Sequence, residues 1–120
     1  MKAVVDELNH VVETFATRIA SIGEPDFSHK PLPDKWSKKE VLGHLIDSGQ
    51  NNLRRFVCGQ YEANPPKIVY DQDFWVSANG YQHMPKEDVI SLWKLVNRQI
   101  GSILKNMAEQ NLLRQCDTGK

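Results

Sequence analysis

The sequence contains few cysteines and does not open with an export signal. Cys58 and Cys116 are its two cysteines, and their spacing matches no zinc or thiol redox motif. The opening residues "MKAVVDELNH" carry acids where a secretory signal would carry an apolar run. Because two cysteines in a reducing compartment are more often free thiols than a bridge, these features together predict a cytoplasmic location.

The chain also lacks an excess of either charge and any long apolar run. Its 15 basic and 15 acidic side chains cancel, so it lacks the electrostatic footprint of a protein that binds nucleic acid or an anionic membrane. No apolar run approaches the roughly 20 residues that a membrane-spanning helix needs. The sequence has no glycine-rich phosphate loop either. Neither nucleic acid nor a membrane is therefore expected as a partner.

What the sequence does contain is helical periodicity within a domain-sized chain. Its 120 residues suit one domain, residues 1–120, with its own core. Three segments carry apolar residues at steps of three and four, and no alternating run long enough for a sheet interrupts them. The first row is Val4, Leu8, Val11, Phe15, Ile19 and Ile22, and the third is Val89, Leu92, Trp93, Val96, Ile100, Ile103 and Met107. These rows predict an all-α bundle.

The middle helix has the clearest start. Ser37 and Glu40 form a capping box, and Trp36 can close on Val41 as a hydrophobic staple. The third helix is expected to begin near Pro85, whose ring suits a first helical turn. The arc of the middle helix expected to face the core comprises Val41, Leu42, Leu45, Ile46, Leu53, Phe56 and Val57.

Both connections between these helices are longer than neighbours in a bundle usually need. The first, "GEPDFSHKPLPDKW", is rich in proline and is expected to run extended over the surface. The second, residues 61–84, is too apolar to be a disordered tether. Asp71 could cap a short helix that ends at Gly80, which would turn Phe74 and Trp75 towards the bundle. The length of this connection permits the second and third helices to run parallel but does not require it.

A polar row lies beside the expected core face of the middle helix. It consists of His44, Ser48, Asn51 and Arg55, which fall within about 60° of one another on a helical projection. A row there could project into a cleft, where an imidazole can bind a metal and Asn or Arg can orient an anionic ligand. Spacing alone favours the alternative, a solvated flank, and a lone histidine is not a metal site. Asp47 could support His44 from the other side, although a solvated carboxylate is the commoner case.

Three stretches taken together resemble the DinB-like superfamily of small bacterial four-helix proteins. They are "KWSKKEVLGHLIDSGQNNLRRF", "YDQDFWVSANGY" and "LWKLVNRQI", and the resemblance runs from about Trp36 to Leu113. A tryptophan before the cap, a mid-helix "HLIDS" and a later aromatic segment occur in the order of that family. The resemblance implies an up-down-down-up four-helix bundle, which the long second connection suits, and often a homodimer.

The resemblance also implies a metal site. Members typically hold a divalent metal, usually zinc or nickel, through one histidine of the second helix and an HxxxH pair on the fourth. They include thiol-dependent transferases and isomerases, in which the metal activates a small thiol, and proteins classed as metal-dependent hydrolases. His44 matches the first ligand by position. Asn51, Arg55 and Trp75 are then expected to bind the substrate, a small thiol or another small molecule, beneath a roof formed by Tyr70 to Tyr81.

This sequence departs from the family pattern at its end. It stops at "NLLRQCDTGK", soon after the third helix, without the fourth helix and its histidine pair. We therefore expect the 120 residues to be a fragment of a longer chain, with an incomplete metal site and an apolar stripe left uncovered. The rival expectation is a non-catalytic helical module that dimerises or binds a partner through that stripe.

Overall fold

The computed structural model describes residues 2–62 and 68–107 of the chain. Within these residues all regular structure is helical, which confirms the predicted all-α class. The three long helices are α1 (Lys2–Ala20), α3 (Lys38–Tyr61) and α5 (Lys86–Asn106). The shorter elements are α2 (Glu24–Ser28), α4 (Gln72–Asn79) and the 3₁₀ helix η1 (Tyr81–His83). Over the same residues, no helix combines the length and the apolar character that crossing a membrane requires.

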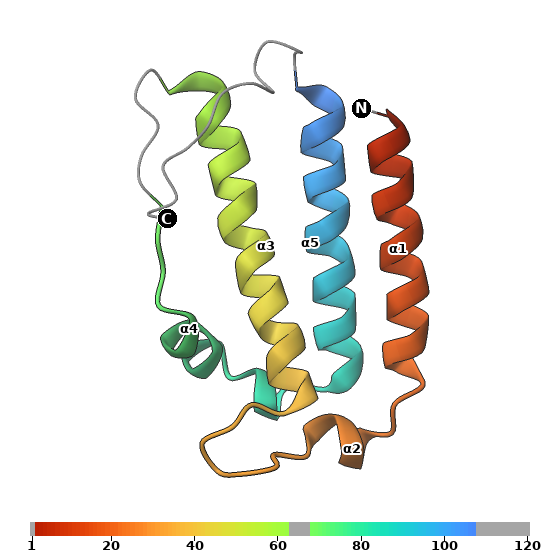
Figure 1. Ribbon diagram of the computed structural model, residues 1–120, viewed down its shortest axis with the longest axis vertical. Helices are drawn as coiled ribbons and strands as arrows, with labels where there is room; N and C mark the ends of the chain where they lie inside the picture. The colour runs from red at the N-terminus through yellow and green to blue at the C-terminus, as the bar shows by residue number, and fades with distance from the viewer. Residues whose placement is uncertain (1, 63–67, 108–120) are drawn as a thin grey trace.

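The three long helices lie side by side with α5 in the middle (Figure 1). α1 runs antiparallel to the other two, whereas α3 and α5 run in the same direction (Figure 1). The chain therefore leaves α3 at one end of the layer and enters α5 at the other, with α4 and η1 beside the start of α3 (Figure 1). This parallel pair is the arrangement that the up-down-down-up topology requires.

Local sequence signals set the helix boundaries as predicted. Ser37 and Glu40 form the expected capping box: the amide of Glu40 donates to Ser37 Oγ at 3.1 Å and that of Ser37 to Glu40 Oε1 at 3.2 Å. Asp71 caps α4 by accepting from the amide of Phe74 at 3.0 Å. Gly80 ends α4 with a φ of 66°, in the left-handed region that glycine adopts without a steric penalty.

The first connection differs from its prediction, because it is not extended throughout. Residues 24–28 form α2, and Phe27 in that helix is only 1% exposed. Pro25 sits in the first turn of α2, where its missing N–H costs no hydrogen bond. One of the prolines therefore marks the start of a helix, and this short helix closes one end of the core.

The core lies between α5 and the elements on either side of it. Its buried members are Ala16, Phe27, Leu42, Ile46, Val76, Tyr81, Val89, Ile90 and Val96. Val89 and Val96 were predicted core positions on α5, and the predicted positions Leu92, Trp93 and Ile100 pack against the same cluster. The apolar row of α5 is therefore largely confirmed.

The first predicted apolar row is confirmed at its end, where Ile19 and Ile22 pack against the core, but its earlier positions on α1 are displaced by about one residue. Val4, Val11 and Phe15 are 57%, 38% and 48% exposed. The buried positions are instead Val5, Val12 and Ala16. Val5 packs over Gly101 of α5, where an added Cβ would meet Val5 Cγ1 at 3.4 Å.

The predicted core arc of α3 is also partly wrong. Leu42 and Ile46 are buried, but Val41, Leu45 and Val57 are 45%, 47% and 39% exposed. Small or polar residues occupy buried positions between them, namely Gly43, Asp47, Gly49 and Asn51. At Gly49, an added Cβ would lie 2.7 Å from Val96 Cγ1, so the glycine permits close approach of α5. The buried face of α3 is therefore chosen by close contact rather than by hydropathy.

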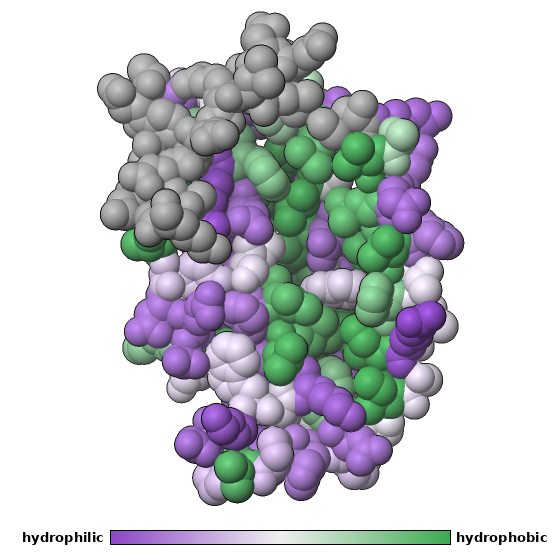
Figure 2. Space-filling model, viewed as in Figure 1, coloured by the Kyte–Doolittle hydropathy of each residue, from purple (hydrophilic) through white to green (hydrophobic). Residues whose placement is uncertain are grey.

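Large apolar side chains remain on the surface of the described residues. They include the α1 row Val4, Val11 and Phe15, the α3 pair Val41 and Leu45, and Leu95 of α5. One face of the molecule carries apolar surface over α5 and α1 and between α5 and α3 (Figure 2). Phe74 of α4 is also 68% exposed, which contradicts its predicted packing, and Val76 fills the core in its place at 1% exposed.

Candidate functional site

The polar row on α3 forms the surface against which the second connection packs. Ser48 Oγ lies 2.7 Å from the hydroxyl of Tyr70, and the two groups share a hydrogen bond. Arg55 Nη2 donates to the backbone carbonyl of Ile68 at 2.6 Å, and Ile68 is 4% exposed. The row was predicted to be either a ligand-binding ridge or a solvated flank. In the structure, two of its four members hold the chain that leads into α4.

The predicted substrate-binding residues already have partners within the protein. Asn51 is 6% exposed, and its amide donates to the backbone carbonyl of Asp47 at 2.9 Å. Arg55 donates a second hydrogen bond, from Nη1 to Asn52 Oδ1, at 2.9 Å. Trp75 of α4 is half-buried, and its ring meets Tyr70 edge to face at 5.6 Å between centroids. Their contact with a substrate stays a prediction, and their contacts in the structure are internal.

His44 is the member of the row whose chemistry is least satisfied. Its half-buried ring packs on Trp36, with centroids 5.2 Å apart and planes inclined by 31°. Nδ1 of His44 is buried and has no hydrogen-bond partner among the described residues. A neutral imidazole has one donor and one acceptor nitrogen, so this ring has capacity for a ligand that the described fold does not use.

Asp47 is fully buried, which corrects the prediction of a solvated carboxylate. Its Oδ1 accepts from the hydroxyl of Tyr81 at 2.6 Å and from Asn79 Nδ2 at 3.1 Å. Burial raises the pKa of Asp47, although the Tyr81 hydrogen bond and the electrostatic interaction with His44 oppose that rise. Burial and the same carboxylate also raise the pKa of Tyr81, so its hydroxyl remains a donor at neutral pH.

Gly43 makes room for this contact. Its Cα faces the Tyr81 ring, and an added Cβ would lie 2.7 Å from Cε2 and nearer still to Cδ2 and Cγ. Tyr81 can therefore cross α3 one turn before Asp47 and reach the carboxylate. The sequence does not predict the contact between Tyr81 and Asp47, because the two residues are 34 positions apart and nothing in the local pattern pairs them.

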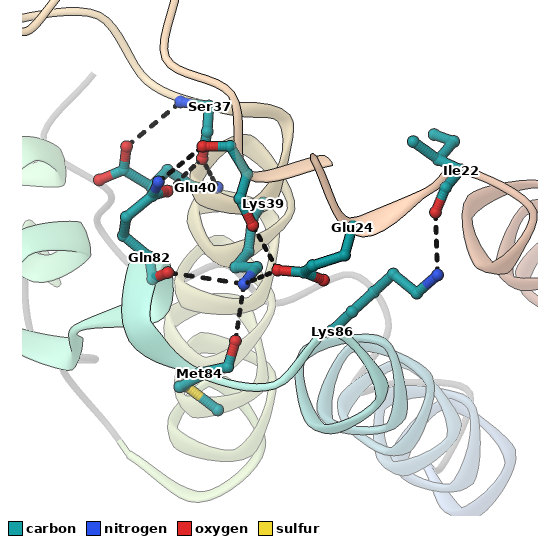
Figure 3. Close-up of polar contacts among 9 residues, drawn as sticks. Ile22, Glu24, Ser37, Lys39, Glu40, Gln82, Met84 and Lys86 are labelled. Atoms are coloured by element: carbon teal, nitrogen blue, oxygen red, sulfur yellow. Dashed lines mark hydrogen bonds and ion pairs between the residues drawn. The ribbon is translucent and has the colours of Figure 1, made fainter. Parts of the chain in front are cut away.

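A buried lysine fastens the same end of the bundle (Figure 3). Lys39 is 3% exposed, and its Nζ lies 2.7 Å from Glu24 Oε1 in α2. The same atom donates to the backbone carbonyls of Met84 at 2.7 Å and Gln82 at 3.5 Å. One ammonium group thus connects α3 with α2 and with the chain between η1 and α5 (Figure 3). Its position near the start of a helix gave no sign of this burial.

A recess of about 510 Å³ opens beside these elements. Trp36 and Val76 are among its apolar lining residues, and Lys30 and Glu40, joined by an ion pair of 2.7 Å, are among its polar ones. The Trp36 ring therefore borders the recess and also packs on His44. Recesses of roughly 300–1,000 Å³ with an aromatic wall and a few polar groups suit small molecules.

The donor set for a metal is partial. Over residues 2–62 and 68–107, no group of three or more His, Cys, Asp or Glu side chains could hold an ion. His44 fits the role of a single ligand, because its ring makes no hydrogen bond within the same residues and zinc sites use imidazole nitrogens. Cys116 and the stretch "NLLRQCDTGK" lie outside the described residues. Further ligands would have to come from outside the part of the chain that is described.

Two known proteins are similar to this chain. A protein of Oceanobacillus iheyensis, named as a candidate metal-dependent hydrolase, is 28% identical over 79 residues. That match covers 66% of this chain but only 45% of the relative, so the matched region spans less than half of that protein. YfiT from Bacillus subtilis, described as a candidate metal-dependent hydrolase with an unusual four-helix bundle topology, superposes with a TM-score of 0.73 at 19% identity. This likeness covers 95% of this chain and 67% of YfiT and concerns the fold.

A family model gives the assignment. The model described as the DinB superfamily matches residues 7–119, which is nearly the whole chain. The match includes α3 with His44 and the packed connection that carries Tyr70, Trp75 and Tyr81. The order of helices agrees, since the long second connection returns the chain so that α3 and α5 are parallel (Figure 1). The chain therefore belongs to the DinB superfamily.

Proposed function

We propose that this chain is part of a metal-dependent enzyme, a hydrolase or a thiol-dependent transferase, in which His44 supplies one ligand to a divalent ion such as zinc or nickel. Family membership and the names of the two similar proteins support the metal. The observation that carries the proposal is the half-buried His44 ring, which makes no hydrogen bond within the described residues and so keeps a nitrogen for an ion. The remaining ligands are proposed to lie outside those residues.

A bound ion would supply acidity, because it lowers the pKa of a coordinated thiol or water and makes a nucleophile near neutral pH. The chain's own residues would position the reactants. Trp36 holds the His44 ring on one side and borders the recess, which is large enough for a small substrate. Arg55 and Ser48 would position the substrate indirectly. They hold the connection that leads to Trp75, and that residue would contact the substrate.

Metal content tests this proposal directly. Protein expressed from its whole natural reading frame should hold about one divalent ion per chain, as measured by elemental mass spectrometry. His44→Ala should abolish that binding, because removing one imidazole from a site of three or four ligands leaves too few. His83→Ala is the matched control, since His83 is exposed and belongs to no metal-competent group among the described residues.

The fold of each variant is checked by far-ultraviolet circular dichroism. Metal-free wild-type protein with intact helicity would refute the proposal, as would a His44→Ala variant that keeps its ion.

The exposed apolar row of α1 favours a second function, association with another copy of the chain. Val4, Val11 and Phe15 recur at helical spacing on one side of α1 and are all well exposed. Apolar surface of this extent is typical of helices that bury it against a partner. This association is compatible with catalysis, and in the absence of metal it would make the chain a dimerisation module.

Sedimentation velocity measures that association. The wild-type chain should show a concentration-dependent dimer, and Phe15→Glu should weaken dimerisation about tenfold or more by placing a charge in the apolar contact. Gln50→Glu adds the same charge at an exposed position of α3 away from this row and should leave the equilibrium unchanged. A wild-type chain that stays monomeric up to about 1 mM, the concentration at which even weak contacts form, would contradict the proposal.

A further inference from the structure

Two buried polar atoms on the same turn of α3 lack partners within the described residues. They are Nδ1 of His44 and Oδ2 of Asp47. Residues at positions i and i+3 of a helix are neighbours on its surface, with Cβ atoms roughly 5–6 Å apart. The two unsatisfied atoms therefore belong to one small region.

Neither atom is expected to stay unpaired. More than about 90% of buried polar groups in proteins have a hydrogen-bond partner. The neighbours of Asp47 cannot satisfy Oδ2, because the single hydroxyl proton of Tyr81 goes to Oδ1. Asn79 uses both amide protons, one to Asp47 Oδ1 at 3.1 Å and one to the carbonyl of Trp75 at 3.0 Å. The Nδ1–H of His44 is the donor that remains on this turn.

We infer that the Asp47 carboxylate accepts the Nδ1–H of His44, directly or through one water molecule, and so holds the imidazole in the Nδ1-protonated tautomer. This pairing satisfies both orphaned atoms at once, with Asp47 as a positioning residue for the ring. It leaves Nε2 as the nitrogen with a free lone pair. The inference rests on the proposed function only in naming Nε2 as the atom offered to a metal, because the hydrogen bond itself needs no ion.

The second connection fixes the carboxylate that makes this bond. Tyr81 reaches Asp47 across Gly43, and Asn79 reaches it from the last turn of α4. Both donors meet the same oxygen, Oδ1, which turns Oδ2 away from them. Tyr81 and Asn79 thereby orient His44 through Asp47, without either residue having to touch the imidazole.

Asp47→Asn offers a sharp test, because the two donors decide how the new amide is oriented. Tyr81 and Asn79 require an acceptor at the Oδ1 position, so the Asn oxygen should lie there and its NH₂ group should replace Oδ2. A donor would then face Nδ1 of His44. The variant should therefore convert the ring from the Nδ1–H tautomer to the Nε2–H tautomer.

Nitrogen-15 NMR of the histidine rings, recorded on metal-free protein at about pH 8 where an ordinary histidine is neutral, distinguishes the two tautomers. We expect His44 to be chiefly Nδ1–H in the wild type and chiefly Nε2–H in Asp47→Asn. Asp88→Asn, at an exposed position of α5, should leave the His44 signals unchanged. Assignment by loss of the signals in His44→Ala identifies the ring.

An Nε2–H tautomer in the wild type would overturn the inference, and so would an unchanged tautomer in a folded Asp47→Asn. If that variant does not fold, the wild-type spectrum decides alone. The result is independent of the metal experiment. If protein from the whole reading frame binds no ion but His44 is Nδ1–H, the proposed function is refuted and the positioning role of Asp47 stands.

Discussion

Replacing Gly43 with alanine should lower the free energy of unfolding by about 3–5 kcal/mol. A Cβ at this position would lie 2.7 Å from Tyr81 Cε2 and closer to two other ring atoms, well inside van der Waals contact. The ring is only 2% exposed and belongs to the buried core cluster, so displacing it would disturb its neighbours. Any displacement also lengthens the 2.6 Å hydrogen bond to Asp47, which would leave a buried carboxylate with less support. Overpacking and lost hydrogen bonding therefore act together.

Urea unfolding followed by circular dichroism measures this loss, and Gly101→Ala is the matched control. Both glycines are buried within long helices, but a Cβ at Gly101 would meet Val5 Cγ1 at 3.4 Å, which is an ordinary contact. Because alanine favours a helix over glycine by up to about 1 kcal/mol, Gly101→Ala should be neutral or stabilising. Equal effects of the two substitutions would contradict the close contact between Gly43 and Tyr81.

Gly43 also shows why the core of α3 could not be read from the sequence. Hydropathy places Val41, Leu45 and Val57 in the core, yet the structure buries Gly43 and Gly49 there because neighbouring residues approach too closely for a side chain. A periodicity argument ranks residues by polarity and carries no information about the distance between helices. Periodicity likewise places Val4, Val11 and Phe15 of α1 in the core, whereas the buried residues are the ones that follow each of them, Val5, Val12 and Ala16.

Features governed by neighbouring residues were predicted well. The capping box of Ser37 and Glu40, the cap at Asp71 and the left-handed Gly80 each depend on a few adjacent positions, and all three are present. Features that depend on distant partners were not. The burial of Asp47 depends on Tyr81 and Asn79, which are 34 and 32 positions away. Nothing in the residues next to Asp47 pairs it with either partner.

The polar row was recognised, although its contacts were not. His44, Ser48 and Arg55 share a flank of α3, as a helical projection requires. The partners that give Ser48 and Arg55 a structural role are Tyr70 and Ile68, which belong to a connection whose path the sequence left open. His44 keeps a buried nitrogen without a hydrogen-bond partner among the described residues. The family resemblance singled out the same residue.

Lys39→Met should destabilise the chain by about 2–4 kcal/mol, an unusually large effect for a lysine. Methionine has similar length and fills the same space, so the loss reports on the ammonium group rather than on packing. Without that group, the carbonyl of Met84 loses its 2.7 Å donor and that of Gln82 loses a longer one of 3.5 Å. Buried acceptors left without a donor cost about 1–3 kcal/mol each. Chemical denaturation of the variant measures the difference.

Lys94→Met is the control for the ion pair by itself. Lys94 Nζ lies 3.2 Å from Glu13 Oε2, with the two side chains 30% and 50% exposed, and such pairs contribute at most about 1 kcal/mol. A loss in Lys94→Met as large as that in Lys39→Met would show that burial of the ammonium group is not the cause.

Two further measurements, the stability of Glu24→Gln and the pH dependence of the Lys39→Met loss, separate the carbonyl contacts of Lys39 from its ion pair with Glu24. The Glu24 side chain is 51% exposed, so Glu24→Gln should cost much less than Lys39→Met.

Hydrogen bonds from Lys39 and then Ser28 lower the pKa of Glu24 below its ordinary value of 4.5. A carboxyl whose pKa is lower in the folded state stabilises the fold above that ordinary value and loses the contribution as the pH falls through its folded pKa. Acid should therefore remove the Glu24 contribution while the carbonyl contacts of Lys39 persist, so most of the Lys39→Met deficit should survive below pH 4.5. A deficit that disappears there would assign the effect to the ion pair instead.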